Sequence, residues 1–155
     1  MANIEEQEYH SIKEVLDANG IYTGLTKGIS MEPLIHHQKD NIIIVKPKCR
    51  LKKYDVPVYL NNGKYIMHRV IEVKEDHYVI VGDNLTKREY VTDDMVVGVL
   101  VGFYKNGKRY VDFEKSRAYK IYSKVWVALL PIRPFFIFIN RCLRWVKRHI
   151  FKKDM

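Results

Sequence analysis

Cysteine is scarce in this chain of 155 residues, which contains only Cys49 and Cys142. The two are far apart in sequence, and neither belongs to a CxxC pair or to a cysteine–histidine cluster with metal-ligand spacing. We therefore predict no metal site, and no residue pattern indicates a cofactor. Two such cysteines do not establish a disulfide, and they leave the redox compartment of the protein open.

The start of the chain lacks the pattern of a secretory signal. Residues 1–10 are acidic and have no apolar core of the kind found in a signal peptide or a membrane anchor. A later stretch, residues 125–139, is apolar except for Arg133, but Pro131 and Pro134 interrupt it. As a helix it would span only ~22 Å, short of the ~30 Å hydrocarbon core of a bilayer. We expect no helix that spans a membrane.

Acidic residues are nearly absent from the last quarter of the chain. Residues 1–114 contain 16 Lys and Arg against 17 Asp and Glu, whereas residues 115–155 contain 11 against one. The net charge of +9 therefore belongs to the tail. A basic tail indicates an anionic partner, either a membrane or a nucleic acid. We divide the chain into a domain, residues 1–114, and a basic, apolar, helical tail, residues 115–155.

What the chain does contain favours a β-rich globular domain. Apolar residues make up 47% of it and charged residues 29%, which fits a folded domain rather than a disordered one. Residues 5–19 have the apolar spacing of a helix, and Gly20 favours its end. The turn Asn61-Asn62-Gly63 predicts a hairpin. Strand-like stretches cover residues 21–26, 41–45, 55–60, 65–74, 79–81, 95–104 and 109–113.

Between the first two strand-like stretches lies the sequence Gly28-Ile29-Ser30-Met31-Glu32-Pro33. Gly28 allows a backbone conformation that other residues resist, and Pro33 restricts the exit from the turn. Ser30 is thereby expected at a rigid, exposed bend. A nucleophilic serine needs an accessible hydroxyl, with backbone N–H groups facing the developing oxyanion. Met31 and Pro33 are expected to border a shallow substrate groove, whereas His36 and His37 are interpreted as solvated loop residues.

Three motifs in order, Ser30-Met31-Glu32-Pro33, His68-Arg69-Val70 and Gly82-Asp83-Asn84, resemble the signal peptidase and LexA-like superfamily of serine proteases. The resemblance covers residues 21–104 and is closest to the serine–histidine signal peptidases of the endoplasmic reticulum, archaea and sporulating bacteria. It implies a bent antiparallel β-sheet catalytic domain without a cofactor. It also implies an endopeptidase that removes a leader or signal segment, following small residues, from a precursor.

The resemblance implies roles for individual residues. Ser30 is the nucleophile and His68 is the general base, at the position where bacterial signal peptidases have a lysine. Many members of the family have a serine two residues before the nucleophile, where this chain has Gly28. Backbone N–H groups, including that of Ser30, are therefore expected to form the oxyanion hole.

A third group is expected to orient the imidazole and stabilise its charged form. Asp83 is the first choice for this group. In the serine–histidine enzymes the acid often lies a few residues after Gly-Asp-Asn, which makes Glu89 the alternative. Asp93 and Asp94 are more distant candidates.

In the tail, residues 141–153 have the pattern of an amphipathic helix, with Cys142, Val146 and Ile150 on one stripe. Such a helix is typical of membrane interfaces, although packing on the β core is the alternative. We expect peripheral binding of residues 125–153 to an anionic membrane surface. The Trp, Phe and Ile content disfavours nucleic acid, and the basic residues favour the cytoplasmic side.

Two other functions stay open at this stage. A LexA-like regulator would cleave itself, but the region before Ile21 is a single acidic helix, too short for a DNA-binding helix-turn-helix. A non-catalytic protein would only dock on a membrane through its basic tail. The serine endopeptidase is the leading hypothesis.

Overall fold

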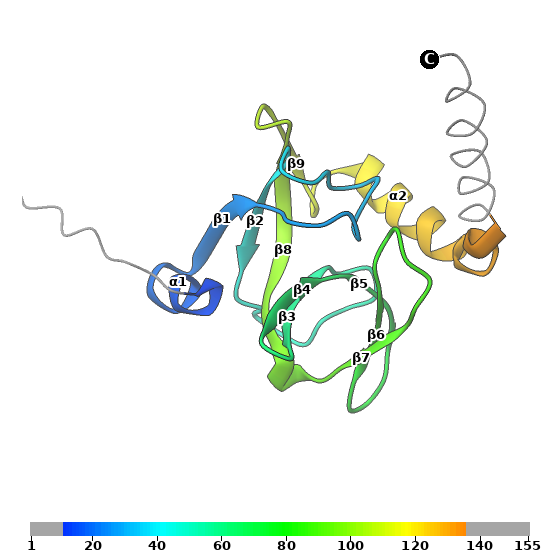
Figure 1. The fold of residues 1–155 in the computed structure, drawn as a ribbon, viewed down its shortest axis with the longest axis horizontal. Helices are drawn as coiled ribbons and strands as arrows, with labels where there is room; N and C mark the ends of the chain where they lie inside the picture. The colour runs from blue at the N-terminus through cyan, green and yellow to red at the C-terminus, as the bar shows by residue number, and fades with distance from the viewer. Residues whose placement is uncertain (1–10, 136–155) are drawn as a thin grey trace, which may run out of the picture.

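A computed structural model of the chain describes residues 11–135. This part is mainly β, with a curled antiparallel sheet, a smaller second sheet, and helices at opposite ends of the domain (Figure 1). Within residues 11–135, no helix is long and apolar enough to cross a membrane.

The N-terminal helix α1 (Ile12–Asn19) has a defined cap at each end. The Ser11 hydroxyl accepts a hydrogen bond from the N–H of Glu14, and Gly20 ends the helix in the left-handed conformation. Leu16 is fully buried and joins the core of the larger sheet. The helix end at Gly20 is confirmed, whereas the predicted helical residues 5–10 lie outside the described residues.

The larger sheet has the strand order β1-β2-β8-β3-β4, with β9 also paired to β8, and all pairs are antiparallel. The predicted hairpin turn joins β3 to β4, with Asn62 and Gly63 both at positive φ. β1 and β4 form the two ends of the strand order, and the sheet curls around its core. The strands are β1 (Ile21–Leu25), β2 (Asn41–Val45), β3 (Pro57–Asn61), β4 (Lys64–Met67), β8 (Val96–Lys105) and β9 (Arg109–Asp112).

The smaller sheet contains β5 (Arg69–Val73), β6 (Tyr78–Val81) and β7 (Glu89–Val91). The single strand predicted over residues 65–74 is wrong, because His68 separates β4 of the larger sheet from β5 of the smaller one. Alternation of exposure fails here, since His68, Arg69 and Val70 are all buried where the chain passes between the two sheets. The prediction missed β7, which is only three residues long.

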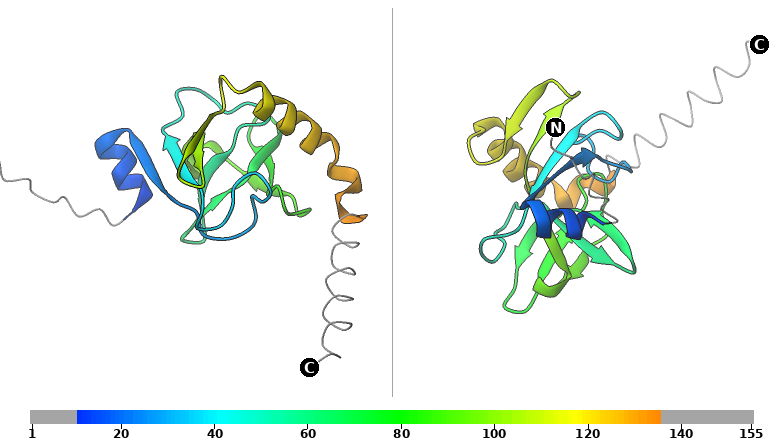
Figure 2. Two further views of the ribbon diagram at one scale, coloured as in Figure 1. Left: turned by 90° about the horizontal axis from the view of Figure 1, so that it is seen from above. Right: turned by 90° about the vertical axis from the view of Figure 1, so that its left-hand side faces the viewer.

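The C-terminal helix α2 (Arg117–Ala128) and the short helix η2 (Leu130–Ile132) pack on the domain (Figures 1 and 2). The Ser116 hydroxyl caps α2 by accepting a hydrogen bond from the N–H of Tyr119. Val127 and Leu130 pack against the apolar cluster of Ile71, Val79 and Val81 on the smaller sheet. The helical character predicted for the tail therefore holds for its described part, whereas the amphipathic helix predicted over residues 141–153 lies outside the described residues.

Candidate active site

Ser30 lies in the turn that connects β1 to β2. Gly28 has a φ of 97°, so this position requires the left-handed conformation that glycine adopts readily. The N–H of Glu32 donates to the carbonyl oxygen of Ile29 at 3.1 Å and closes the turn around Ser30. Met31 is buried in the core and anchors the turn from below. Ser30 lies at a bend, as the sequence predicted, but it is half-buried rather than exposed.

His68 lies between the two sheets and is 5% exposed. Its Nδ1 is 2.6 Å from Oε2 of Glu89 in β7, and the Tyr59 hydroxyl from β3 donates to the same oxygen. Because an ionised carboxylate only accepts hydrogen bonds, His68 Nδ1 carries a proton. In the neutral imidazole this leaves Nε2 as an acceptor, the form required of a general base.

The local environment keeps Glu89 ionised and Tyr59 protonated. Partial burial alone would raise the pKa of Glu89, but the hydrogen bonds from Tyr59 and His68 outweigh it and hold that pKa below its ordinary value. Burial, together with the neighbouring Glu89 carboxylate, raises the pKa of Tyr59. At neutral pH, Tyr59 is therefore a hydrogen-bond donor to a charged Glu89.

Gly82 brings His68 and the Ser30 turn together. A Cβ on residue 82 would lie 3.0 Å from Nε2 of His68 and 2.8 Å from the carbonyl oxygen of Ser30. A side chain at residue 82 would displace either the His68 ring or the Ser30 carbonyl group. Glycine therefore allows the two to lie close to residue 82. Within residues 11–135, no hydrogen bond joins the Ser30 hydroxyl to His68. Such bonds are often long without substrate and shorten in the substrate complex.

Asn84 holds the Ser30 turn through two hydrogen bonds. Its N–H donates to the carbonyl oxygen of Ser30 at 2.8 Å, and its side-chain amide donates to the carbonyl oxygen of Ile29 at 3.2 Å. The Gly82-Asp83-Asn84 turn therefore contacts the Ser30 turn through its first and third residues.

Asp83, the first choice for the third catalytic group, is not placed beside His68. Its two carboxylate oxygens accept hydrogen bonds from Nε and Nη2 of Arg69 at 2.8 and 2.7 Å, and both side chains are 1% exposed. The alternative, Glu89, occupies the position next to His68. Of the more distant candidates, Asp93 accepts a hydrogen bond from Tyr78 instead, and Asp94 is exposed.

An apolar hollow of about 520 Å³ opens beside Ser30, between the edge strands β1 and β4. Residues of both edge strands form its walls, and Met31 and Ser30 are both among its lining residues. Pro33 is exposed and is not among the lining residues, so the structure does not place it in the groove. The walls include Tyr22, Leu25, Tyr65 and Met67.

Two residues at this site carried no functional interpretation from the sequence. Tyr59 lies in an ordinary apolar strand pattern, and nothing local distinguishes it from a core tyrosine. His37, interpreted as solvated, accepts a hydrogen bond at Nδ1 from the N–H of Gly28 at 3.0 Å. Its closeness to the glycine turn in sequence was the only available indication.

Comparison with known proteins leaves the function to be argued from these groups. No protein-family model matches the chain, and no curated protein sequence matches it.

Proposed function

We propose that this protein is a serine endopeptidase of the signal peptidase-like type, which removes a leader or signal segment from a precursor through an acyl-enzyme. The observation that supports this most strongly is the hydrogen bond between His68 and Glu89. Nε2 of His68 and the carbonyl oxygen of Ser30 both lie next to Gly82. The bent sheet architecture and the order of the three motifs fit the same proposal.

In the proposed reaction, Ser30 Oγ attacks the carbonyl carbon of the scissile bond while its proton passes to Nε2 of His68. Nε2 then donates that proton to the leaving amine as the C–N bond breaks. Water attacks the resulting ester while His68 takes a proton from it, and Nε2 then gives this proton to Ser30 Oγ as the ester C–O bond breaks and the acid product leaves. Glu89 holds the Nδ1–H tautomer throughout and stabilises the imidazolium that forms twice in this cycle.

The oxyanion would be bound by backbone N–H groups. Among residues 11–135, the N–H of Ser30 has no hydrogen-bond acceptor, as a donor to an oxyanion requires. The N–H of Gly28 already donates to His37 and is therefore not the first candidate.

The substrate fits as an extended peptide beside the edge strands. β1 and β4 each have a neighbour on one side only, and an edge strand presents unpaired N–H and C=O groups to an added strand. The apolar hollow between them would take the side chains of that segment, and Ser30 lies on its lining. Resemblance to signal peptidases implies small residues just before the scissile bond.

The test is cleavage of leader-bearing peptides followed by mass spectrometry. We expect Ser30→Ala and His68→Ala to abolish cleavage, whereas His77→Ala, at a histidine between β5 and β6, retains it. Equal cleavage by the wild type and Ser30→Ala would refute the serine mechanism. A break in the intact protein itself during incubation would favour the LexA-like alternative.

We further propose that the peptidase acts at an anionic membrane surface. It would bind there peripherally, through the outward face of α2 and through residues 125–153. The outward face of α2 supports this, because it has an apolar half and a basic half. Ile121 and Val125 are 63% and 50% exposed, and Phe135 beyond η2 is 64% exposed. The basic half consists of Arg117, Lys120 and Lys124.

Vesicle flotation tests the membrane proposal. We expect binding to vesicles that contain anionic lipid, little binding to neutral vesicles, and weaker binding after Ile121→Ser combined with Val125→Ser. Binding to duplex nucleic acid but not to anionic vesicles would overturn it.

A further inference from the structure

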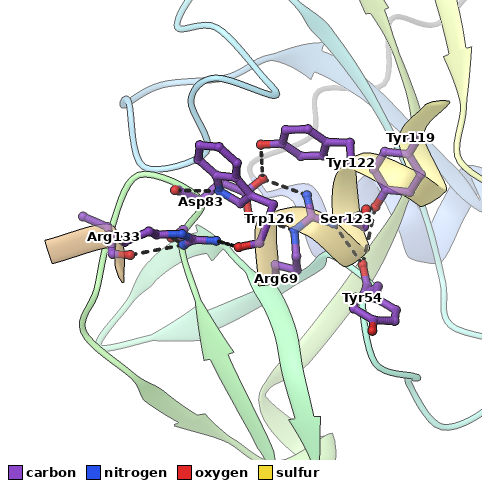
Figure 3. A network of polar contacts seen from close by, with 10 residues as sticks. Tyr54, Arg69, Asp83, Tyr119, Tyr122, Ser123, Trp126 and Arg133 are labelled. Atoms are coloured by element: carbon purple, nitrogen blue, oxygen red, sulfur yellow. Dashed lines mark hydrogen bonds and ion pairs between the residues drawn. The ribbon is translucent and has the colours of Figure 1, made fainter. Parts of the chain in front are cut away.

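The inward face of α2 is polar, which is unusual for a helix that packs on a core. Val127 packs on the apolar cluster of the smaller sheet, but the polar side chains of this face contact the turn of residues 82–85 and the Arg69–Asp83 pair (Figure 3). These are the elements on either side of the proposed active site, since Arg69 follows His68 and the turn touches Ser30.

Three carbonyl oxygens of the 82–85 turn are held by the C-terminal segment. The indole N–H of Trp126 donates to the carbonyl oxygen of Asp83 at 2.9 Å. Nη1 of Arg133 donates to the carbonyl oxygens of Gly82 at 3.3 Å and Leu85 at 3.4 Å. Nη2 of Arg133 donates to the backbone carbonyl oxygen of Trp126 at 2.6 Å, which ties the Arg133 side chain to the end of α2.

The same helix also binds the Arg69–Asp83 pair. Nη1 of Arg69 donates to the hydroxyls of Tyr119 at 3.1 Å and Ser123 at 2.8 Å. The Tyr122 hydroxyl donates to Oδ2 of Asp83 at 3.0 Å. The residue after the proposed base and the turn that supports the nucleophile are thus both attached to one helix.

Arg133 is used here as a hydrogen-bond donor rather than as an ion-pair partner. It is 5% exposed, its guanidinium lies over the Trp126 ring at 4.9 Å, and every acceptor described for it is a backbone carbonyl. Its Nε has no partner within residues 11–135. A buried cation without a carboxylate is costly, so its placement indicates a role in holding the turn rather than in stabilising the fold alone.

We propose that α2 and η2 clamp the 82–85 turn against Ser30 and His68, with Trp126 and Arg133 as positioning residues for the active site. Movement of the turn reaches both groups, because the N–H of Asn84 holds the Ser30 carbonyl and Gly82 lies against the His68 ring. A displacement of about 1 Å at a reacting group costs on the order of 100-fold in rate. The catalytic consequence rests on the proposed peptidase function, whereas the structural consequence does not.

The structural consequence is tested by amide hydrogen exchange on the full-length protein. We expect Trp126→Phe, which keeps an aromatic ring but removes the N–H donor, to speed exchange at Asn84 about tenfold through local opening. Exchange at Ile80 in β6 should stay unchanged, which separates the turn from global unfolding. Tyr110→Phe is the matched control, because it removes an exposed hydroxyl that has no described hydrogen bond.

A second readout follows the active site directly, through the imidazole NMR signals of histidine-labelled protein. We expect the His68 signals to shift in Trp126→Phe and in Arg133→Lys, which keeps the charge but loses the forked donor geometry. For peptide cleavage, we expect kcat to fall about tenfold while KM changes little. Tyr122→Phe tests the same clamp with the smallest change in packing.

The two proposals fail in different ways. A wild-type protein that cleaves no leader peptide would count against the peptidase, while the exchange and NMR measurements would still decide the clamp. Unchanged Asn84 exchange and unchanged His68 signals in Trp126→Phe and Arg133→Lys would overturn the clamp, even if both variants cleave slowly.

Discussion

His68 and Arg69 are neighbours in sequence, yet they lie in two different polar environments. His68 faces Glu89 and Tyr59 between the two sheets, and the Glu89 side chain is 23% exposed. Arg69 faces Asp83 and the inward side of α2, with both members of the ion pair 1% exposed. The first environment contains a histidine beside a partly solvated carboxylate, whereas the second contains an ion pair that is closed to water.

The comparison teaches that the function of a carboxylate depends on which cation it meets. Burial alone disfavours the charged form of Arg69, but the carboxylate of Asp83 outweighs this and raises the pKa of the guanidinium. Arg69 therefore stays protonated, and its two hydrogen bonds to Asp83 support the structure. Glu89 instead meets an imidazole, and in the proposed mechanism it orients that ring.

The largest effect expected is on catalysis, from Glu89→Gln. An amide is neutral and cannot stabilise the imidazolium, so we expect kcat to fall by about 10³ to 10⁴, as in other triads without their acid. Cleavage rates and thermal unfolding should be measured together, with Glu72→Gln as the control at an exposed strand position. Retention of more than a tenth of the activity would show that Glu89 is not the third group.

Asp83→Asn, in the buried ion pair with Arg69, should lower stability. Removal of one partner leaves Arg69 buried and uncompensated, which costs about 3 to 5 kcal/mol in the free energy of unfolding. Urea unfolding measures this, with Asp76→Asn as the control at a carboxylate whose side chain is 84% exposed. A loss as small as that of the control would remove the distinction between the two environments.

A smaller effect is expected from Tyr59→Phe, which removes one donor to Glu89. A hydrogen bond to a charged group contributes about 1.5 to 3 kcal/mol to stability, and the variant should lose an amount in that range. Because this bond lowers the pKa of Glu89, its loss should raise that pKa, which NMR titration of the Glu89 carboxyl signal measures. Tyr90→Phe, at a tyrosine that is 66% exposed, is the control. An unchanged Glu89 pKa in Tyr59→Phe would contradict the coupling.

The smallest effect expected is the pH dependence of stability that Glu89 contributes. Its pKa is lower in the folded protein than the ordinary value of about 4.3 in the unfolded chain. The stabilisation is therefore fully present above about pH 4.3 and is lost as the pH falls through the lower folded value. Unfolding of the wild type and Glu89→Gln between pH 3 and 6 measures it, and parallel curves would contradict the expectation.

Several elements could be predicted because local patterns determine them. β2 matches the predicted residues 41–45, and the Asn62-Gly63 hairpin and the Gly20 helix end were found from turn chemistry. Ser30 was placed at a bend because Gly28 and Pro33 restrict the chain on both sides. Each of these outcomes depends on residues within a few positions of one another.

Other elements depend on contacts that a local pattern does not contain. The break at His68 arises where the chain leaves one sheet for the other, so every side chain there is buried and the alternation disappears. α2 was hard to place on the core, because its inward face contains Tyr122, Ser123 and Trp126 rather than an apolar stripe. That face is explained only by the ion pair it covers.

The amino-acid order was enough to identify a serine turn, a histidine motif and a mainly β architecture, since each has a short-range signature. It was not enough to choose between Asp83 and Glu89. Glu89 reaches His68 because β7 lies on one side of β6 and β5 lies on the other. Asp83 instead binds Arg69 and side chains of α2. Hydrogen bonds and ion pairs act over about 3 Å in space, whatever the separation along the chain. The partner of each carboxylate was therefore settled only when the sheets and the helix packed together.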